Sequence, residues 1–296
     1  MGSFAAQHLH KNTRIGNVYS IHKQAINIET DNGMLIGIID SSFGNYIANI
    51  RVNFPISFNL TNFIHQKTDV FHENNKIKFI SSPLEISLLN TEVWNPQIDL
   101  SFFKFRFSLK KRLNECKKEL LQYSRSQLNF LLNDQSPPNQ WCRSGSRAYE
   151  KLKEGIVSYN AKLCLETLKR IIGLGPGWTP SWDDFLAGFF ASLYLIKCQN
   201  QETNPLYNLL QHIKEDKHLF WSRTTPQSFQ QIQFGLKGHL PEEHLLILNQ
   251  LFHGGPKSLA SFLTRIFNIG HTSGADLLVG LLEGLHFVLT NFNKRK

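Results

Sequence analysis

The chain has 296 residues, enough for one large domain or two smaller ones, and its 41% hydrophobic content is typical of a globular protein. It has no charged start followed by an apolar run and no uncharged apolar stretch of about 18 residues, so we expect neither a signal peptide nor a membrane span. The four cysteines form no Cys-x-x-Cys pair, which favours free buried thiols in a cytoplasmic protein.

The formal net charge is +9, but the basic residues lie in small groups at 110–112, 117–118 and 294–296. A solvated basic surface with affinity for small anions is the simplest interpretation, since basic runs alone are weak motifs. We expect no membrane partner and place nucleic acid last among the candidate partners. Affinity that falls steeply with salt would indicate nucleic acid.

Residues 1–108 are predicted to form a β-rich domain, because short segments of strand-type residues alternate with turn signals. Asp31-Asn32-Gly33 predicts a hairpin, since Asn-Gly tolerates the positive φ that such turns need. The candidate strands lie at 18–21, 25–28, 34–39, 46–52, 77–80 and 103–107, with a second turn at 72–76. This spacing predicts a small antiparallel barrel or sandwich.

Helical periodicity begins near residue 109. We expect a helical connector and linker over 109–145, broken by Pro137 and Pro138, and a helical domain over 146–296. The predicted helices of this domain span 146–172, 180–198, 205–214, 226–237, 241–251, 256–268 and 273–290. The expected fold class is α+β, a β-rich N-terminal barrel or sandwich followed by an all-helical C-terminal domain.

One motif occurs twice in the helical part. The pattern Ser-x-x-Asp-x-Leu-x-Gly runs from Ser181 to Gly188 and returns 92 residues later, from Ser273 to Gly280. Each serine could cap its helix with the aspartate three residues on, as in a capping box, and Thr179 is an alternative cap for the first helix. The two helix glycines, which disfavour a helix interior, indicate close approach of the two helices or of a ligand.

Several features exceed what capping requires. The first motif follows a loop that holds Gly173, Gly175 and Gly177, and Asp183 adds a carboxylate that a cap does not use. The second follows Gly270, His271 and Thr272. Amides at helix starts, hydroxyls, carboxylates and an imidazole can together hold a small polar molecule and move a proton. We therefore predict that the two stretches meet and line one anion-binding site.

A third segment, Arg223-Thr224-Thr225, precedes Pro226. It suits a carboxylate or phosphate because a guanidinium makes two parallel hydrogen bonds, and the alternative is an N-cap at Thr225. The sequence shows no metal-ligand spacing, and His239, His244 and His253 are expected at the surface. No cofactor is demanded, although paired aspartates could hold Mg²⁺ through water.

The two motifs and the Arg-Thr-Thr-Pro segment resemble the domain-of-unknown-function family 2877 over residues 150–290. That family includes a chain identified as the third subunit of bacterial oxamate carbamoyltransferase, of anaerobic allantoin breakdown. The N-terminal half is similar only in general character. The resemblance implies carbamoyl transfer between phosphate and an amide or amine, on an oxamate- or oxalurate-type substrate.

Under this interpretation the catalytic residues are His271, Asp184 and Asp276. The residues that bind the substrate carboxylate, carbamoyl group or phosphate are Gly173, Gly175, Gly177, Thr179, Ser181, Asp183, Arg223, Thr224, Thr225, Gly270, Thr272 and Ser273. The resemblance also implies other protein subunits as partners. The alternative function is a non-catalytic anion-binding or regulatory subunit of a multi-chain enzyme.

Two residues depart from the pattern of that family. Trp178 stands where leucine is usual, and Trp182 stands where glycine is usual. An indole just inside a helix start is expected to narrow or cover the pocket.

Overall fold

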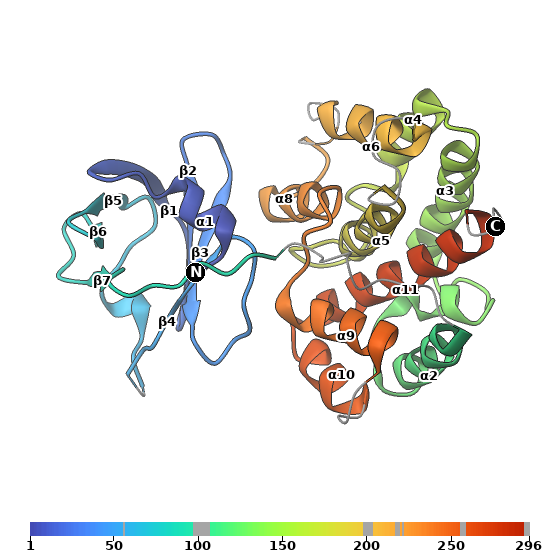
Figure 1. The fold of residues 1–296 in the computed structure, drawn as a ribbon. Coiled ribbons are helices and arrows are strands. Elements are labelled where there is room, and N and C mark those ends of the chain that lie inside the picture. Colours follow the sequence, from blue (N-terminus) through green and yellow to red (C-terminus); the bar gives the residue numbers. More distant parts are fainter. Residues whose placement is uncertain are drawn as a thin grey trace. The chain divides into compact units, whose positions relative to one another are not determined.

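A computed structural model describes residues 1–55, 57–96, 107–197, 204–216, 220, 222–254 and 259–292. The chain divides into two compact units, Met1–Pro96 and Gln97–Lys296 (Figure 1). The boundary therefore falls at residue 96, before the predicted position at 108. The predicted strand at 103–107 lies outside the described residues except for Phe107, which instead begins a helix.

The first unit is built on one seven-stranded sheet in the order β4-β3-β2-β1-β5-β6-β7. Neighbouring strands are antiparallel except for the parallel pair of β3 and β4. The strands are β1 (Thr13–His22), β2 (Ala25–Thr30), β3 (Leu35–Asp40), β4 (Asn49–Val52), β5 (Asp69–Glu73), β6 (Lys76–Phe79) and β7 (Glu85–Ser87), preceded by α1 (Ser3–His8), with η1 (Leu60–Asn62) before β5.

Both predicted turns join neighbouring strands. Gly33 has φ 77° between β2 and β3, and Asn74 and Asn75 have φ 51° and 57° between β5 and β6. Positive φ at both central residues, as at Asn74 and Asn75, is the mark of a tight hairpin turn, whereas in the turn between β2 and β3 only Gly33 has positive φ. The alternation seen in the sequence becomes the pleat, since Ile26 and Ile28 are fully buried.

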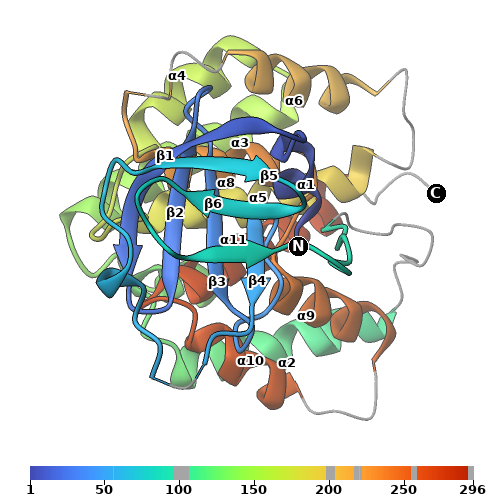
Figure 2. The ribbon, with the colours of Figure 1, turned by 90° about the vertical axis from the view of Figure 1, so that its left-hand side faces the viewer.

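The sheet is open, so of the two predicted forms the barrel is wrong and the sandwich-like form fits. Figure 2 shows β5, β6 and β7 crossing over β2, β3 and β4. The two halves of the sheet share one apolar core, to which Ile26, Ile36, Val70 and Ile77 contribute.

The second unit is helical. Its elements are α2 (Phe107–Tyr123), η2 (Gln127–Leu132), α3 (Gln140–Val157), α4 (Ala161–Ile171), α5 (Ser181–Lys197), α6 (Pro205–Glu215), α8 (Pro226–Gly235), α9 (Glu242–His253), α10 (Leu259–Phe267) and α11 (Ser273–Asn291). Leu113 and Leu120 of α2 and Leu128 of η2 belong to the same core as the later helices. The segment predicted as a connector is thus part of the helical core.

The helix predicted over 146–172 is two helices, α3 and α4. Tyr159 between them has φ 53°, a left-handed conformation that a helix cannot continue. The Asn160 side chain then accepts a hydrogen bond from the Leu163 amide at 3.0 Å and caps α4. The other helices after α5 begin within about three residues of their predicted starts.

Helices α5 and α11 form the centre of this unit (Figure 1). By length and composition α11 could cross a bilayer, but 78% of its most apolar window is buried inside the unit. This burial fits the predicted role of the segment as a buried core helix.

Candidate functional site

The starts of α5 and α11 meet, as predicted, and the two copies of the motif contact each other reciprocally. The Ser273 hydroxyl of α11 lies by the carboxyl group of Asp184, and the Ser181 hydroxyl of α5 lies by that of Asp276. Further along, the Ser192 hydroxyl of α5 donates to the Leu281 carbonyl oxygen at 2.7 Å. Because early residues contact early residues and later ones contact later ones, the two helices run parallel and their positive dipole ends converge.

Asp183 ties the loop and the third segment to α5. Its carboxylate accepts the Gly173 amide hydrogen at 2.8 Å and the hydroxyl hydrogen of Thr224. The side chain is completely buried, and this burial raises its pKa to about 6 although both hydrogen bonds favour the charged form. Asp183 therefore connects α5 to the glycine loop and to the segment that contains Thr224.

Asp184 is buried to 1% exposure, and neither of its carboxyl oxygens has a hydrogen-bond partner within the described residues. Burial raises its pKa well above the ordinary value, and the neighbouring Asp276 and Asp183 carboxyl groups raise it further. The hydroxyls of Ser273 and Thr179 act in the opposite direction. Burial of Asp184 therefore favours its neutral, protonated form over the charged carboxylate.

Asp276 is also completely buried, and burial raises its pKa to about 6. One of its oxygens accepts the hydroxyl hydrogen of Ser126, and the other has no partner among the described residues. Ser126 lies just before η2, inside the segment predicted as a connector, and no local sequence pattern indicates this contact. The three aspartates thus form a buried carboxyl cluster, Asp183, Asp184 and Asp276.

The capping interpretation of the repeated motif is wrong for the second copy. Helix α11 begins at Ser273, and Thr272 before it makes no side-chain capping bond. The Asp276 carboxylate turns to Ser126 instead of the helix start. Capping does hold for the third segment, where the Thr225 hydroxyl accepts the Ser228 amide hydrogen at 3.2 Å and Pro226 follows at the first helical position.

The glycine loop has an unusual backbone conformation, and the first amides of α5 form hydrogen bonds within the chain. Gly173, Gly175 and Gly177 have φ values of 84°, 115° and 97°, which favour glycine. The amides of Trp182, Asp183 and Asp184 all donate to loop carbonyls, of Leu174 for the first and Pro180 for the other two. These three amides at the start of α5 are therefore not directed at a ligand.

A pocket of about 280 Å³ opens at the start of α11. It is lined by Tyr123, Arg125, Phe267, Asn268, Gly270, His271 and Ala275. Of the predicted residues it brings together Gly270 and His271. Arg125, an exposed arginine before η2, is a lining residue that the sequence analysis missed.

Arg223 does not line this pocket. Its guanidinium donates to the Lys169 carbonyl oxygen at 2.7 Å, near the end of α4. Its own carbonyl oxygen lies so close to Gly173 that a Cβ atom there would overlap it. The position of Arg223 thus explains the need for glycine at 173, and Arg125 is the arginine that lines the pocket at the start of α11.

Trp182 does not cover a pocket. It is completely buried, and its ring lies where a Cβ atom on Gly145 of α3 would be. The ring also packs edge-on against Phe185, with centroids 5.0 Å apart. Trp178, in contrast, is 55% exposed at the tip of the glycine loop.

His244 was predicted at the surface, and this prediction is wrong. The side chain is 1% exposed, and its Nε2–H donates to the Gly274 carbonyl oxygen at 2.9 Å, which supports the first turn of α11. Burial lowers the pKa of His244 to about 4, so the ring is neutral at pH 7. His253 is exposed and His239 is partly buried.

Among the described residues, no group of three or more histidine, cysteine, aspartate or glutamate side chains is arranged to hold a metal ion. Cys116, Cys142 and Cys164 are free and buried, while Cys198 lies outside the described residues. Burial raises the pKa of the Cys116 and Cys164 thiols to about 12, so these thiols are unreactive at pH 7.

Two family models match the chain. Residues 171–285, which contain both copies of the motif, match the model described as oxamate carbamoyltransferase subunit AllH. Residues 2–93 match the AllH family N-terminal domain, so the similarity extends to the half that resembled the family only in general character.

The chain belongs to the AllH family. It is accordingly a carbamoyltransferase-related subunit, which supports protein partners. No solved structure matches the chain. The three aspartates of the carboxyl cluster lie inside residues 171–285, whereas Ser126 and Arg125 come from the segment between the two matched regions.

Proposed function

We propose that this chain is a catalytic subunit of a carbamoyltransferase assembly, and that the paired starts of α5 and α11 form its reaction site. The observation that supports this most strongly is Asp184, a buried carboxyl group with no hydrogen-bond partner among the described residues, whose pKa burial raises well above the ordinary value. A fully buried acid without a hydrogen-bond partner is costly to folding, and such groups concentrate at functional sites.

The reaction that fits is transfer of a carbamoyl group between phosphate and the amide nitrogen of an oxamate-type substrate. In the direction that forms carbamoyl phosphate, a phosphate oxygen attacks the carbamoyl carbon and the bond from this carbon to the amide nitrogen breaks. The leaving nitrogen needs a proton, and in this proposal Asp184 supplies it. The free oxygen of Asp276 can accept a hydrogen bond from the carbamoyl NH2 group.

The pocket beside the cluster suits the substrate carboxylate. Arg125 can make two parallel hydrogen bonds to a carboxylate, and the dipole of α11 favours negative charge there. His271, which is exposed at the rim, can exchange protons with solvent. The proposal does not require Mg²⁺ bound through water by the aspartates.

The carboxyl cluster is closed in this chain, because Asp183, Asp184 and Asp276 are each no more than 1% exposed. A substrate can reach Asp184 only if the residues that cover it move, and we propose that a partner subunit causes this movement. The proposal therefore predicts activity in an assembly and none in the isolated chain.

The alternative is a non-catalytic subunit that binds a small anion at Arg125. The satisfied amides at the start of α5 favour this alternative, since they leave fewer donors for a transition state. In the first proposal the carboxyl cluster takes part in the reaction, whereas in the alternative the chain only binds the anion and changes the apparent affinity of the assembly.

The test is an assay of carbamoyl phosphate plus oxamate with this chain alone, candidate partner subunits alone, and both together. The proposal predicts turnover only with both. If the partners alone turn over substrate at the full rate and this chain changes only the apparent affinity, the non-catalytic alternative is correct.

A further inference from the structure

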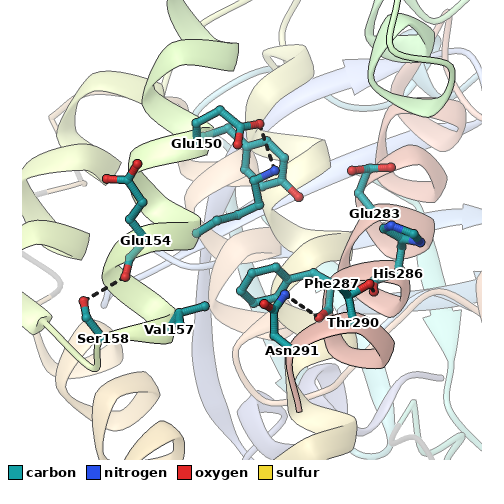
Figure 3. A pocket seen from close by; sticks show the side chains of 11 residues that line it. Glu150, Glu154, Val157, Ser158, Glu283, His286, Phe287, Thr290 and Asn291 are labelled. Atoms are coloured by element: carbon teal, nitrogen blue, oxygen red, sulfur yellow. Dashed lines mark hydrogen bonds and ion pairs between the residues drawn. The ribbon is translucent and has the colours of Figure 1, made fainter. Parts of the chain in front are cut away.

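A second and larger pocket, of about 530 Å³, lies at the opposite end of α11 from the carboxyl cluster (Figure 3). It is formed between the last turns of α3 and α11, with Val157 and Ser158 on one side and Thr290 and Asn291 on the other. The proposed reaction does not use this pocket.

Two helix C-termini border this pocket, and each carries a partial negative charge. Side chains cap some of the last carbonyl groups: the Ser158 hydroxyl donates to the Glu154 carbonyl oxygen at 2.7 Å, and the Asn291 amide donates to that of Phe287 at 3.0 Å. The dipoles of both helices nevertheless favour a cation here.

The acidic side chains that line the pocket have the same negative sign as the two helix C-termini. Glu150, Glu154 and Glu283 line the pocket together with Lys153, whose ammonium nitrogen lies 2.8 Å from a Glu150 carboxylate oxygen. Burial lowers the pKa of His286, which leaves that ring neutral. The Lys117 Nζ atom lies 3.5 Å from Glu283 Oε1, but Lys117 does not line the pocket. Three carboxylates thus face at most two cations, in a chain whose net charge is +9.

The buried wall of the pocket is aromatic. Phe287 is 6% exposed and Tyr149 is 1% exposed, and the Tyr149 hydroxyl has no hydrogen-bond partner among the described residues. The ammonium group of Lys153 lies 4.8 Å from the centre of the Tyr149 ring. The ring face therefore already accepts one primary ammonium group through a cation–π contact.

We propose that this pocket binds a small organic cation, a primary ammonium group on an apolar or aromatic body. The ammonium would lie between the Glu283 carboxylate and the unpartnered Tyr149 oxygen, both of which accept hydrogen bonds. The apolar body would cover Phe287 and Val157. Nothing in this proposal depends on the reaction proposed for the carboxyl cluster.

The test is calorimetric titration of the full chain with benzylamine, whose ammonium group and ring match these features. Benzyl alcohol has the same shape without the charge and serves as the matched ligand. Saturable binding of benzylamine, at least tenfold tighter than that of benzyl alcohol, supports the proposal. Equal binding of the two ligands, or no saturable binding of benzylamine, overturns it.

Two variants locate the binding. Val157→Trp should abolish benzylamine binding by filling the pocket, because Val157 is 48% exposed and its replacement leaves the core intact. Glu283→Gln should weaken binding at least fivefold, whereas Glu166→Gln, at an exposed position of α4, should not change it. Undiminished binding to a folded Val157→Trp variant would show that benzylamine binds elsewhere and would contradict the proposal.

Discussion

Gly188 of α5 and Gly280 of α11 are related by the repeat, and each lies against the backbone of the other helix. A Cβ atom on Gly188 would overlap the Leu277 carbonyl oxygen, and one on Gly280 would overlap that of Phe185. Leu277 and Phe185 are themselves equivalent positions of the motif. The close approach of two parallel helices thus has an internal symmetry, and it brings the two helix starts together.

Alanine at either glycine should therefore destabilise the protein, although alanine favours helices by about 1 kcal/mol. Because the obstacle is backbone, which cannot rotate away, we expect Gly188→Ala and Gly280→Ala each to lower the free energy of unfolding by about 1–3 kcal/mol or more in urea titrations. Gly155→Ala in α3 is the control, since its new methyl would meet the Cys164 side chain. A decrease in the free energy of unfolding of Gly155→Ala as large as that of Gly188→Ala or Gly280→Ala would contradict this explanation.

Asp276→Asn should stabilise the protein by an amount that grows with pH. Burial raises the pKa of Asp276 from 3.8 to about 6, so the stability that protonation contributes is complete below about pH 4 and is lost as pH rises to about 6. Asparagine cannot ionise, yet it still accepts the Ser126 hydroxyl hydrogen.

The measurement is Tm for both proteins from pH 4 to pH 8 at constant ionic strength. The Tm of the variant minus that of the wild type should increase from about pH 4 to about pH 6 and then level off, and the underlying free energy amounts to roughly 1.4 kcal/mol per pKa unit. The subtraction removes the contributions of His239 and His244 to the pH dependence of Tm, because the pKa values of both histidines are lowered to about 4 in either protein. A difference that does not vary with pH would show that Asp276 ionises normally.

The two tryptophans that depart from the pattern of the family should differ in their contribution to stability. Trp182→Ala removes a completely buried indole and should cost about 3–5 kcal/mol in urea unfolding. Trp178→Leu, at a position 55% exposed, should change stability by less than about 0.5 kcal/mol. Similar losses in both variants would contradict the core position of Trp182.

Arg125→Ala should weaken oxamate binding to the assembly at least tenfold, because the charge-assisted bonds to a carboxylate would be lost. Arg223→Ala should leave oxamate affinity unchanged, since its guanidinium is bonded to the Lys169 carbonyl oxygen. Calorimetric titration measures both. A larger loss of oxamate affinity in Arg223→Ala than in Arg125→Ala would indicate that the anion binds at Arg223.

Local sequence signals predicted most of the elements but not the contacts between them. Asn-Gly and Asn-Asn turns, caps such as Asn160 and helical periodicity depend on neighbours in the chain, and the repeated motif correctly predicted that two helix starts meet. The break between α3 and α4 at Tyr159 was not predicted, because no feature of the local sequence indicates that a tyrosine adopts a left-handed conformation.

The missed site residues, Ser126, Arg125 and His244, share a different cause. Each approaches the start of α11 from a segment distant in the sequence, and no local pattern around it indicates that contact. The same reason explains Trp182, whose position depends on the space that Gly145 leaves in α3. Tertiary packing, and not local propensity, decides all four.

The role of Asp184 is tested most directly by the turnover number of the assembly that contains Asp184→Asn. Asparagine has the same shape but cannot supply a proton, so we predict a loss of at least about 100-fold in kcat with Tm not lowered. Asp134→Asn, at an exposed left-handed position that asparagine tolerates, should keep full activity. An Asp184→Asn assembly that turns over at the wild-type rate would contradict the account.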